Sequence, residues 1–237
     1  MDQPIRSQNH MLASLPAGDF ALLRPHLRPI ELRHEAVLFD VGDTISRVFF
    51  PHSGIVSLVV DLTSGETVEA AMIGRDGVVG GSAALDGEAS LSRAIVQIAG
   101  AGSELDLGTL RQVAEQSPAC SKILIRHERT TLAQAQQGAA CNAVHRLEAR
   151  LARWLLWTRD LSGSDTLPLT QEFLAEMLGV QRTSISVVAH TLQKAGLITY
   201  RRGRIRVVDT DGLREAACEC YETLKSHYDR LIGWRPS

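Results

Sequence analysis

The sequence predicts an α+β chain with a strand-rich N-terminal half, a long central helix and a C-terminal helix-turn-helix. Three observations predict this order. Short apolar segments alternate with turn formers before residue 110, glycine almost disappears between residues 108 and 163, and a helix–turn–helix pattern spans residues 169–196. A length of 237 residues suits one large domain or two modest ones. We therefore divide the chain into residues 1–110, 111–138 and 139–237.

Eleven of the 19 glycines lie between residues 42 and 108, within the strand-rich half. Apolar, β-branched segments between such turns, at a spacing of roughly 8–12 residues, are typical of a β-sandwich or jelly roll. We therefore predict a β-sandwich or jelly roll over residues 1–110. The expected strands are 48–50, 55–60, 67–72 and 94–99. Before them, we expect Asp19 to cap a short helix.

The central segment is predicted to form a long helix. Pro118 suits the first turn of a helix, and a thin apolar stripe follows it. A second helical pattern includes Leu147, Leu151 and Trp154, so we place a hinge near residues 138–140. The stripe consists of Ile123, Leu124, Leu132, Ala135 and Ala139.

Residues 169–196 predict two short helices joined by a tight turn. Thr170 is a suitable N-cap, and Gly179 stands where the first helix can end in a left-handed conformation. The second helix is expected to open at Thr183 or Ser184 and to end at Gly196. Compact hydrogen-bonding groups and one arginine face outward at its start, a set that can contact base edges in a major groove. These candidates are Gln181, Arg182, Thr183, Ser184 and Ser186.

A basic hairpin follows the second helix. Residues 198–200 and 205–207 alternate as two strands around Arg201, Arg202, Gly203 and Arg204. We interpret these arginines, with Arg206 beside them, as contacts to DNA phosphates. Thr170 and Gln171, at a helix N-terminus, are also expected to meet a phosphate.

The charge is unevenly distributed. The whole chain has a formal net charge of −2, but residues 1–141 carry −5, residues 142–208 carry +5, and residues 209–237 carry −2. The total therefore excludes only a uniformly basic protein, and the positive segment coincides with the helix-turn-helix and its hairpin. Two helices and a run of charges can also belong to an ordinary helical bundle with a solvated charged face. The basic hairpin directly after the second helix favours DNA binding instead.

Several classes of protein are disfavoured. No run of about 18 apolar residues and no signal-peptide core is present, so we expect a cytoplasmic protein without a membrane partner. No Gly-x-Ser-x-Gly, Walker or His-Glu-x-x-His motif occurs, so we do not expect an enzyme. We interpret Glu66 and Glu69 as charges on a strand face.

The cysteines and histidines form two weak local groups. Cys141 and His145 are spaced i, i+4, with Cys120 and His127 on the preceding segment, and Cys218, Cys220 and His227 lie near the C-terminus. Because small buried thiols and surface or hinge histidines are the commoner explanation of such spacings, we predict no metal site and interpret the cysteines as buried thiols. A redox switch at Cys120 or Cys141 stays open.

The tail from Asp211 to Trp234 shows the spacing of one further amphipathic helix. We expect it to pack on its own domain, and an added dimer or regulatory contact is the alternative.

These motifs resemble the Crp–Fnr transcription regulators. Residues 169–186 and 192–198 and the hairpin at residues 202–205 are similar to the family's winged helix-turn-helix, and residues 36–43 and 49–54 resemble the first strands of its cyclic-nucleotide-binding jelly roll. The resemblance implies a double-stranded β-helix jelly roll over residues 1–110 that serves as a sensor domain, and a bacterial homodimer joined by the central helix. It also implies a near-palindromic operator on double-stranded DNA and a contact with RNA polymerase.

The recognition helix departs from the family pattern. The positions of the family's Arg-Glu-x-x-x-Arg read Arg182, Thr183 and Val187 here, so we do not expect the usual half-site. The alternative function is a cyclic-nucleotide-responsive or other ligand-binding module whose helix-turn-helix contacts protein.

The sensor half departs too. The family's phosphate-binding Gly-Glu pair reads Gly80-Gly81, and its Arg-Ser pair reads Leu91-Ser92, with Arg93 displaced. Ala135 and Gln136 replace the hydroxyls that would meet the base. A cyclic phosphate would therefore lack its charge partner, and we predict no cyclic nucleotide and no other cofactor. An iron–sulfur cluster is disfavoured because the first cysteine is Cys120. The sequence does not identify the signal that controls the sensor domain, and a small-molecule effector is one option.

Overall fold

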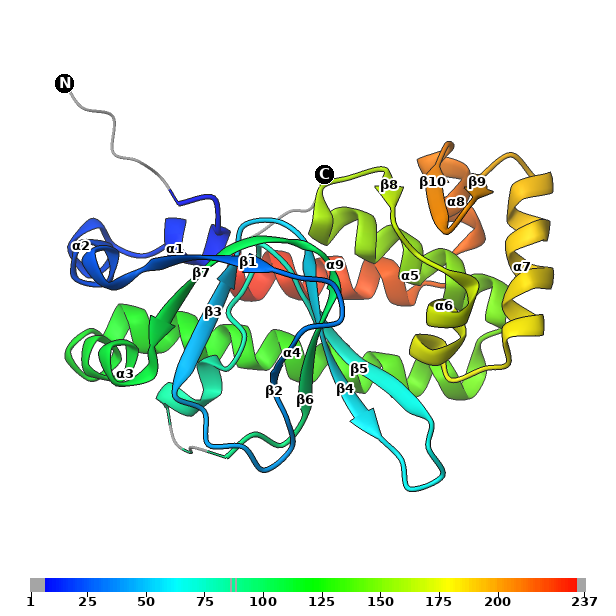
Figure 1. Cartoon of the computed structure of the whole chain (residues 1–237). Helices are drawn as coiled ribbons and strands as arrows, with labels where there is room; N and C mark the ends of the chain where they lie inside the picture. Colours follow the sequence, from blue (N-terminus) through cyan, green and yellow to red (C-terminus); the bar gives the residue numbers. More distant parts are fainter. Residues whose placement is uncertain (1–6, 86, 88, 234–237) are drawn as a thin grey trace.

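The computed structural model describes residues 7–85, 87 and 89–233. Figure 1 shows a strand-rich part joined by a long helix to a smaller helical part that contains a short hairpin. The N-terminal helices are α1 (His10–Ala13), α2 (Ala17–Leu23) and the 3-10 turn η1 (Arg24–His26). The N-cap of α2 is Pro16, so the prediction that Asp19 caps it is wrong. Asp19 lies in the first turn, where its carboxylate accepts a hydrogen bond from Ser117 Oγ at 2.5 Å.

The strand-rich part is built of two antiparallel sheets, as the jelly-roll prediction required. One has the order β1-β7-β3 and the other the order β2-β6-β4-β5. All four predicted strands are present, at β3, β4, β5 and β6. The strands are β1 (Arg28–Leu32), β2 (Val37–Phe39), β3 (Arg47–Pro51), β4 (Ile55–Asp61), β5 (Thr67–Ile73), β6 (Arg93–Ile98) and β7 (Gly100–Asp106), with the 3-10 turn η2 (Gly81–Ala84) before β6.

Strand β7 is the middle strand of its sheet, yet its composition gave little sign of a strand. It contains Gly100 and Gly102, which normally weaken a strand. A Cβ at Gly100 would lie 2.2 Å from the Ser53 carbonyl oxygen, and one at Gly102 would lie 2.8 Å from that of Phe50. The glycines are therefore required because the backbones approach closely here.

The central helix α4 runs from Pro118 to Val144, after the separate helix α3 (Leu107–Gln116). Pro118 stands in the first turn, as predicted, and Ser117 caps the helix. The predicted hinge at residues 138–140 is wrong, because α4 continues through Gly138 and ends at the extended residue His145. A helical glycine costs only about 1 kcal/mol, and the packing of α4 along α9 outweighs this cost.

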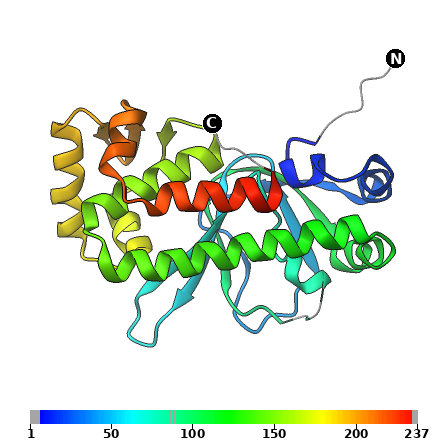
Figure 2. The ribbon, with the colours of Figure 1, turned by 180° about the vertical axis from the view of Figure 1, so that it is seen from behind.

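The C-terminal part begins with α5 (Leu147–Ser162), which is almost entirely buried. It continues with β8 (Thr166–Leu167), α6 (Gln171–Leu178), α7 (Arg182–Lys194), β9 (Ile198–Arg201) and β10 (Arg204–Val207). The predicted single tail helix is instead two helices, α8 (Thr210–Ala216) and α9 (Cys220–Ile232), separated by an extended Ala217. Figure 2 shows α9 lying along α4, so the tail also packs on the central helix and not only on its own domain.

Gln134, buried on α4, connects the sensor sheet to the C-terminal part. Its amide nitrogen donates to the Met72 carbonyl on β5 at 2.9 Å, and its amide oxygen accepts from the Met72 N–H at 3.1 Å. The same oxygen accepts from Trp157 Nε1 on α5 at 3.2 Å, and the amide nitrogen donates to the Tyr228 hydroxyl on α9. One side chain thus joins four elements. Within the described residues, no helix is long and apolar enough to cross a bilayer.

Candidate nucleic-acid interface

The first helix of the helix-turn-helix is fixed at both ends by local interactions. Thr170 Oγ1 accepts a hydrogen bond from the Phe173 N–H at 3.1 Å, as an N-cap does. Gly179 ends α6 with φ +62°, a left-handed conformation that favours glycine. A Cβ at Gly179 would lie 3.4 Å from Val68 on β5, so the turn also touches the sensor sheet.

The second helix, α7, begins at Arg182 with Gln181 as its N-cap, slightly before the predicted start. Ile185, Ala189 and Leu192 are buried against the rest of the domain. Gln181, Arg182 and Thr183 are exposed, whereas Ser184 and Ser186 are half-buried. The structure therefore places all five predicted base-contact candidates at the N-cap and in the first two turns of α7.

Two of the predicted contacts already bind each other. Ser186 Oγ donates a hydrogen bond to Gln171 Oε1 at 2.5 Å and also contacts the Arg182 carbonyl at 3.1 Å. Arg182 lies 3.8 Å from the Glu172 carboxylate, but its side chain is 64% exposed. Arg182 is thus the candidate best able to reach outward, while Gln171 and Ser186 hold α6 and α7 together.

The hairpin has the form that its sequence predicted. Strand β9 pairs with β10, with Arg201 opposite Arg204, and β8 pairs with the other edge of β10. Arg202 and Gly203 form the two-residue turn with φ +50° and +72°, and positive φ at both positions is typical of a type I′ hairpin. Ile205 and Val207 are buried, so the intervening arginines point to the exposed face.

The hairpin arginines have no acidic partners among the described residues. Arg201, Arg202, Arg204 and Arg206 are all exposed. Within the part of the chain that the structure describes, none of them lies within 4.0 Å of a carboxylate oxygen. Four guanidinium groups without acidic partners suit contacts to a phosphate backbone.

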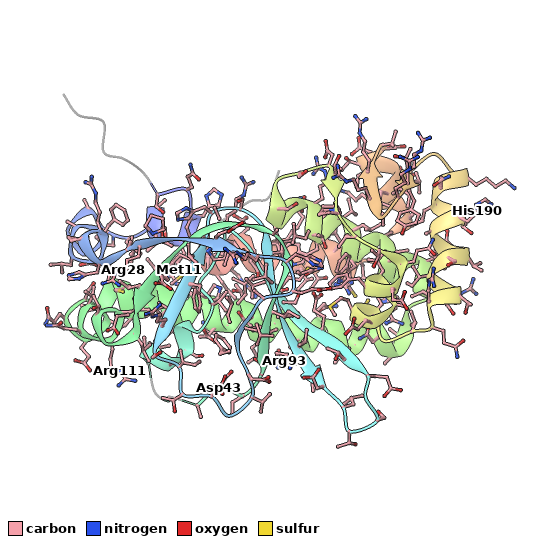
Figure 3. All side chains as sticks on the ribbon, viewed as in Figure 1. Met11, Arg28, Asp43, Arg93, Arg111 and His190 are labelled. Atoms are coloured by element: carbon pink, nitrogen blue, oxygen red, sulfur yellow. The ribbon has the colours of Figure 1, made fainter. Side chains whose placement is uncertain are left out.

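The exposed face of α7 extends further than the predicted residues. Val187 is 67% exposed, and His190, Thr191 and Lys194 are exposed as well. Figure 3 shows His190 on the outer edge of α7. Helical periodicity continued from Thr183 to positions 187, 190, 191 and 194 would have indicated this face.

The sensor sheet and α4 line a cavity of about 300 Å³, with Gly80 and Gly87 in its wall. Among the described residues that line it, none is lysine or arginine, and Glu128 from α4 is one of the lining residues. The displaced Arg93 is held elsewhere, by ion pairs of 3.0 Å to both Asp40 and Asp61. The other described lining residues are Phe39, Ile45, Leu58, Ile73, Val78, Ser82, Ala83, Ala89, Ser90, Leu91, Ser92 and Thr131. The cavity wall is thus mainly apolar, with a carboxylate and small hydroxyls.

The sensor sheet and the C-terminal part also meet at Glu69 on β5. Trp154 Nε1 on α5 donates to Glu69 Oε1 at 2.8 Å, and Ser57 Oγ donates to Glu69 Oε2 at 2.7 Å. Burial raises the pKa of the Glu69 carboxyl to about 7, against the lowering effect of these two hydrogen bonds and of Arg153. The interpretation of Glu69 as a simple strand-face charge is therefore wrong, because it lies between two parts of the molecule.

Comparisons with known proteins agree with this geometry. Residues 149–216 match the model of the Crp-like helix-turn-helix domain. The fold resembles that of FixK2 from Bradyrhizobium japonicum, with 16% identity, a TM-score of 0.70, and coverage of 81% of this chain and 98% of that one. No curated protein sequence matches the chain.

Two further solved structures share the fold. A CRP/FNR-family transcriptional regulator from Thermus thermophilus is 22% identical, with a TM-score of 0.64 over 80% of this chain and 98% of that one. The c-di-GMP responsive regulator CLP from Xanthomonas campestris is 18% identical, with a TM-score of 0.64 over 81% and 99% of the two chains. Residues 149–216 therefore match a Crp-like helix-turn-helix domain, and the chain as a whole has the fold of these solved Crp–Fnr structures.

Proposed function

We propose that the protein acts as a homodimer on a near-palindromic operator, and that an input to the sensor domain controls it. Support for the dimer comes from α4, which keeps an apolar stripe exposed. Ile125, Leu132 and Ala139 follow one another at seven-residue intervals on this exposed side. Ile125 is 48% and Leu132 57% exposed, and an apolar residue at every seventh position supplies one of the two apolar positions of the heptad by which parallel helices pack together.

On the operator, each residue group has a separate role. Arg182 contacts a base edge at the start of α7, with Gln181, Thr183 and Ser184 beside it. Arg201, Arg202 and Arg204 contact phosphates, and the N-terminus of α6 at Thr170 meets another phosphate. Two such α7 helices in a dimer read half-sites about one DNA turn apart. The observation that carries this proposal is the absence of acidic partners around the hairpin arginines of the described chain.

The input would act by moving α4 relative to the sheet. Gln134 bonds β5, α5 and α9 at once, so a shift of α4 would change the orientation of the helix-turn-helix. The mainly apolar cavity with Glu128 in its wall favours an uncharged or cationic small-molecule effector over a phosphate. In the cytoplasm, a contact with RNA polymerase would convert DNA binding into regulation.

The test of the DNA-binding proposal is selection of bound duplexes from a random DNA pool, followed by affinity measurements at several salt concentrations. We expect an enriched near-palindrome and a steep loss of affinity with salt, because phosphate contacts release counterions. Recovery of no common motif would contradict the proposal. Salt-insensitive association with protein would instead favour the alternative, a ligand-binding module whose helix-turn-helix contacts protein.

The dimer is tested separately with Leu132→Glu. A charge in the exposed α4 stripe should yield a monomer in sedimentation and binding to isolated half-sites only. Leu62→Glu is the matched control, because Leu62 is 50% exposed in the turn after β4, outside α4. A wild-type chain that sediments as a monomer at micromolar concentration would refute the dimer while leaving DNA binding intact.

A further inference from the structure

Four potential metal ligands that are remote in sequence meet at the C-terminal end of α4. Cys141 and His145 come from the last turn of α4 and the residue after it, Cys218 lies in the break between α8 and α9, and Cys220 is the first residue of α9. Their sulfur and ring-nitrogen atoms all lie within 4.8 Å of one another. The Cys141 and Cys218 sulfurs are 3.5 Å apart, and Cys220 Sγ is 3.6 Å from His145 Nδ1.

Two features of the chain produce this arrangement. The i, i+4 spacing of Cys141 and His145 puts both on one side of α4 as the helix ends. The extended Ala217 separates α8 from α9, which places Cys218 and Cys220 beside that helix end. The three cysteines are buried, with Ala149 packed against them, and the His145 side chain is 21% exposed. The group is therefore shielded from solvent yet open on one side for an ion to enter.

The distances fit a single tetrahedral ion. In a tetrahedral zinc site with Zn–S bonds of about 2.3 Å, neighbouring ligand atoms lie about 3.8 Å apart. The observed separations of 3.5 and 3.6 Å are close to that value. An iron–sulfur cluster binds its cysteines through different iron atoms and would hold the sulfurs further apart. Three thiols and one imidazole are a ligand set that zinc prefers.

The surrounding residues also suit a bound cation. His145 turns Nδ1 toward the cysteines, while its Nε2 is 3.1 Å from the Glu219 carboxylate, an arrangement typical of metal-bound histidines. Gln137 Nε2 donates a hydrogen bond to Cys220 Sγ at 3.0 Å. Arg150 and Arg153 on α5 lie close enough to Cys141 to interact with its charge. These two cations would offset the charge of −1 that three thiolates and Zn²⁺ together carry.

We propose that Cys141, His145, Cys218 and Cys220 form a Cys₃His site that binds one Zn²⁺ per chain. On binding, the three thiols release their protons to solvent, and the ion joins the end of α4 to the α8–α9 junction. Arg150, beside the site, donates to the Leu178 carbonyl at the end of α6 at 2.6 Å. The ion therefore fixes the angle between the central helix and the helix-turn-helix, a role distinct from any ligand of the sensor cavity.

The experiment uses the full chain, purified with a thiol reductant and without oxidants. Zinc content and Zn²⁺ titration should give one ion per chain. Co²⁺ should produce thiolate charge-transfer bands and the strong visible bands of a tetrahedral site. Cys141→Ser, Cys218→Ser, Cys220→Ser and His145→Gln should each lose stoichiometric binding. Glu219→Gln should weaken binding by about 10- to 100-fold, as removal of a partner behind a metal-bound histidine does.

Cys120→Ser is the matched control, because Cys120 is equally buried on α4 but lies in the sensor core. It should bind Zn²⁺ like the unmodified chain. Circular dichroism of each variant checks folding, and Glu219→Gln, whose side chain is 77% exposed, keeps the test valid if a cysteine variant unfolds. Less than one ion per folded chain, or equal loss in Cys120→Ser, would overturn the proposal. So would a Cys141–Cys218 disulfide without bound metal in the reduced preparation.

Discussion

The arginines of the hairpin and the arginine near the sensor cavity differ in whether their charges are neutralised by acidic partners. Arg201, Arg202 and Arg204 are exposed and have no acidic partner within 4.0 Å among the described residues. Arg93, near the cavity, is bound to two aspartates at 3.0 Å, and the described cavity wall contains a glutamate but no basic residue. In Figure 3, Arg93 lies on the sheet, far from His190 on α7. Whether a cation is already neutralised, and not merely whether it is present, decides which region can bind phosphate.

The largest expected effect comes from removing the free charges. The triple variant Arg201→Ala, Arg202→Ala, Arg204→Ala loses up to three phosphate contacts, each releasing about 0.9 counterions. At about 0.1 M salt, this predicts roughly 100- to 1,000-fold weaker binding to any duplex and a salt slope reduced by about 3. Mobility-shift titrations at several salt concentrations measure both quantities. Arg33→Ala, which removes an exposed arginine already paired with Glu31, should change neither the affinity nor the salt slope. If the triple variant also left both unchanged, the hairpin arginines would not contact phosphates.

Arg182 tests whether α7 reads bases while the hairpin only positions the protein. Arg182→Ala should weaken binding to the selected operator by about 1–3 kcal/mol and relax the sequence preference at one position of each half-site. Arg182→Lys keeps the charge but not the two-pronged donor geometry, so it should retain non-specific affinity and still lose the preference. Competition assays with operator and scrambled duplexes separate the two terms. If the Arg182 variants kept the operator preference of the unmodified chain, the base contact would have to come from another residue.

Glu69 tests the junction between the two regions. Its pKa of about 7 is higher than its ordinary value of 4.5, so the folded state holds the proton more tightly than the unfolded chain. The stability that this proton provides is present below pH 4.5 and is lost as pH rises through about 7. Between pH 5 and pH 8, Glu69 should therefore destabilise the protein by roughly 2 kcal/mol, a loss that Glu69→Gln abolishes. Denaturant unfolding at the two pH values measures the difference, and parallel pH profiles would contradict it.

The smallest effect is expected at the cavity. Because its described wall has no cation to neutralise a phosphate, cyclic AMP and cyclic GMP should leave both calorimetric heats and operator affinity unchanged at about millimolar concentration. Freeing Arg93 with Asp40→Asn and Asp61→Asn should alter stability by no more than about 1 kcal/mol, since both pairs are partly exposed. Micromolar binding of either nucleotide to the unmodified chain would contradict the prediction that the cavity, unlike the hairpin, does not bind phosphate.

Local chemistry made the helix-turn-helix predictable. The Thr170 cap, the left-handed Gly179 and the Arg202-Gly203 turn are each determined by neighbours a few residues away, and the structure has all three. Strand β7 was not predicted because its glycines are required by a close approach to backbone segments that are remote in sequence. The hinge was misplaced because packing against α9 overrides the weak helix propensity of Gly138.

The cysteine cluster shows the same limit of local reasoning. Cys141 and Cys218 are 77 residues apart, and no local pattern places them in contact. Their meeting depends on the break at Ala217, where the amphipathic spacing predicted one continuous helix. Each half of the site was visible in the sequence, but the number of ligands became four only when the fold joined them.

The Gln134 amide has a consequence for how α4 can move. Rotating α4 by a single residue, about 100°, would carry this side chain away from Met72, Trp157 and Tyr228 together. Intermediate rotations would leave a buried amide unsatisfied, which costs about 1–3 kcal/mol. The Gln134 hydrogen bonds therefore hold α4 in one rotational position, and a stimulus that turned the helix would have to break all of them together.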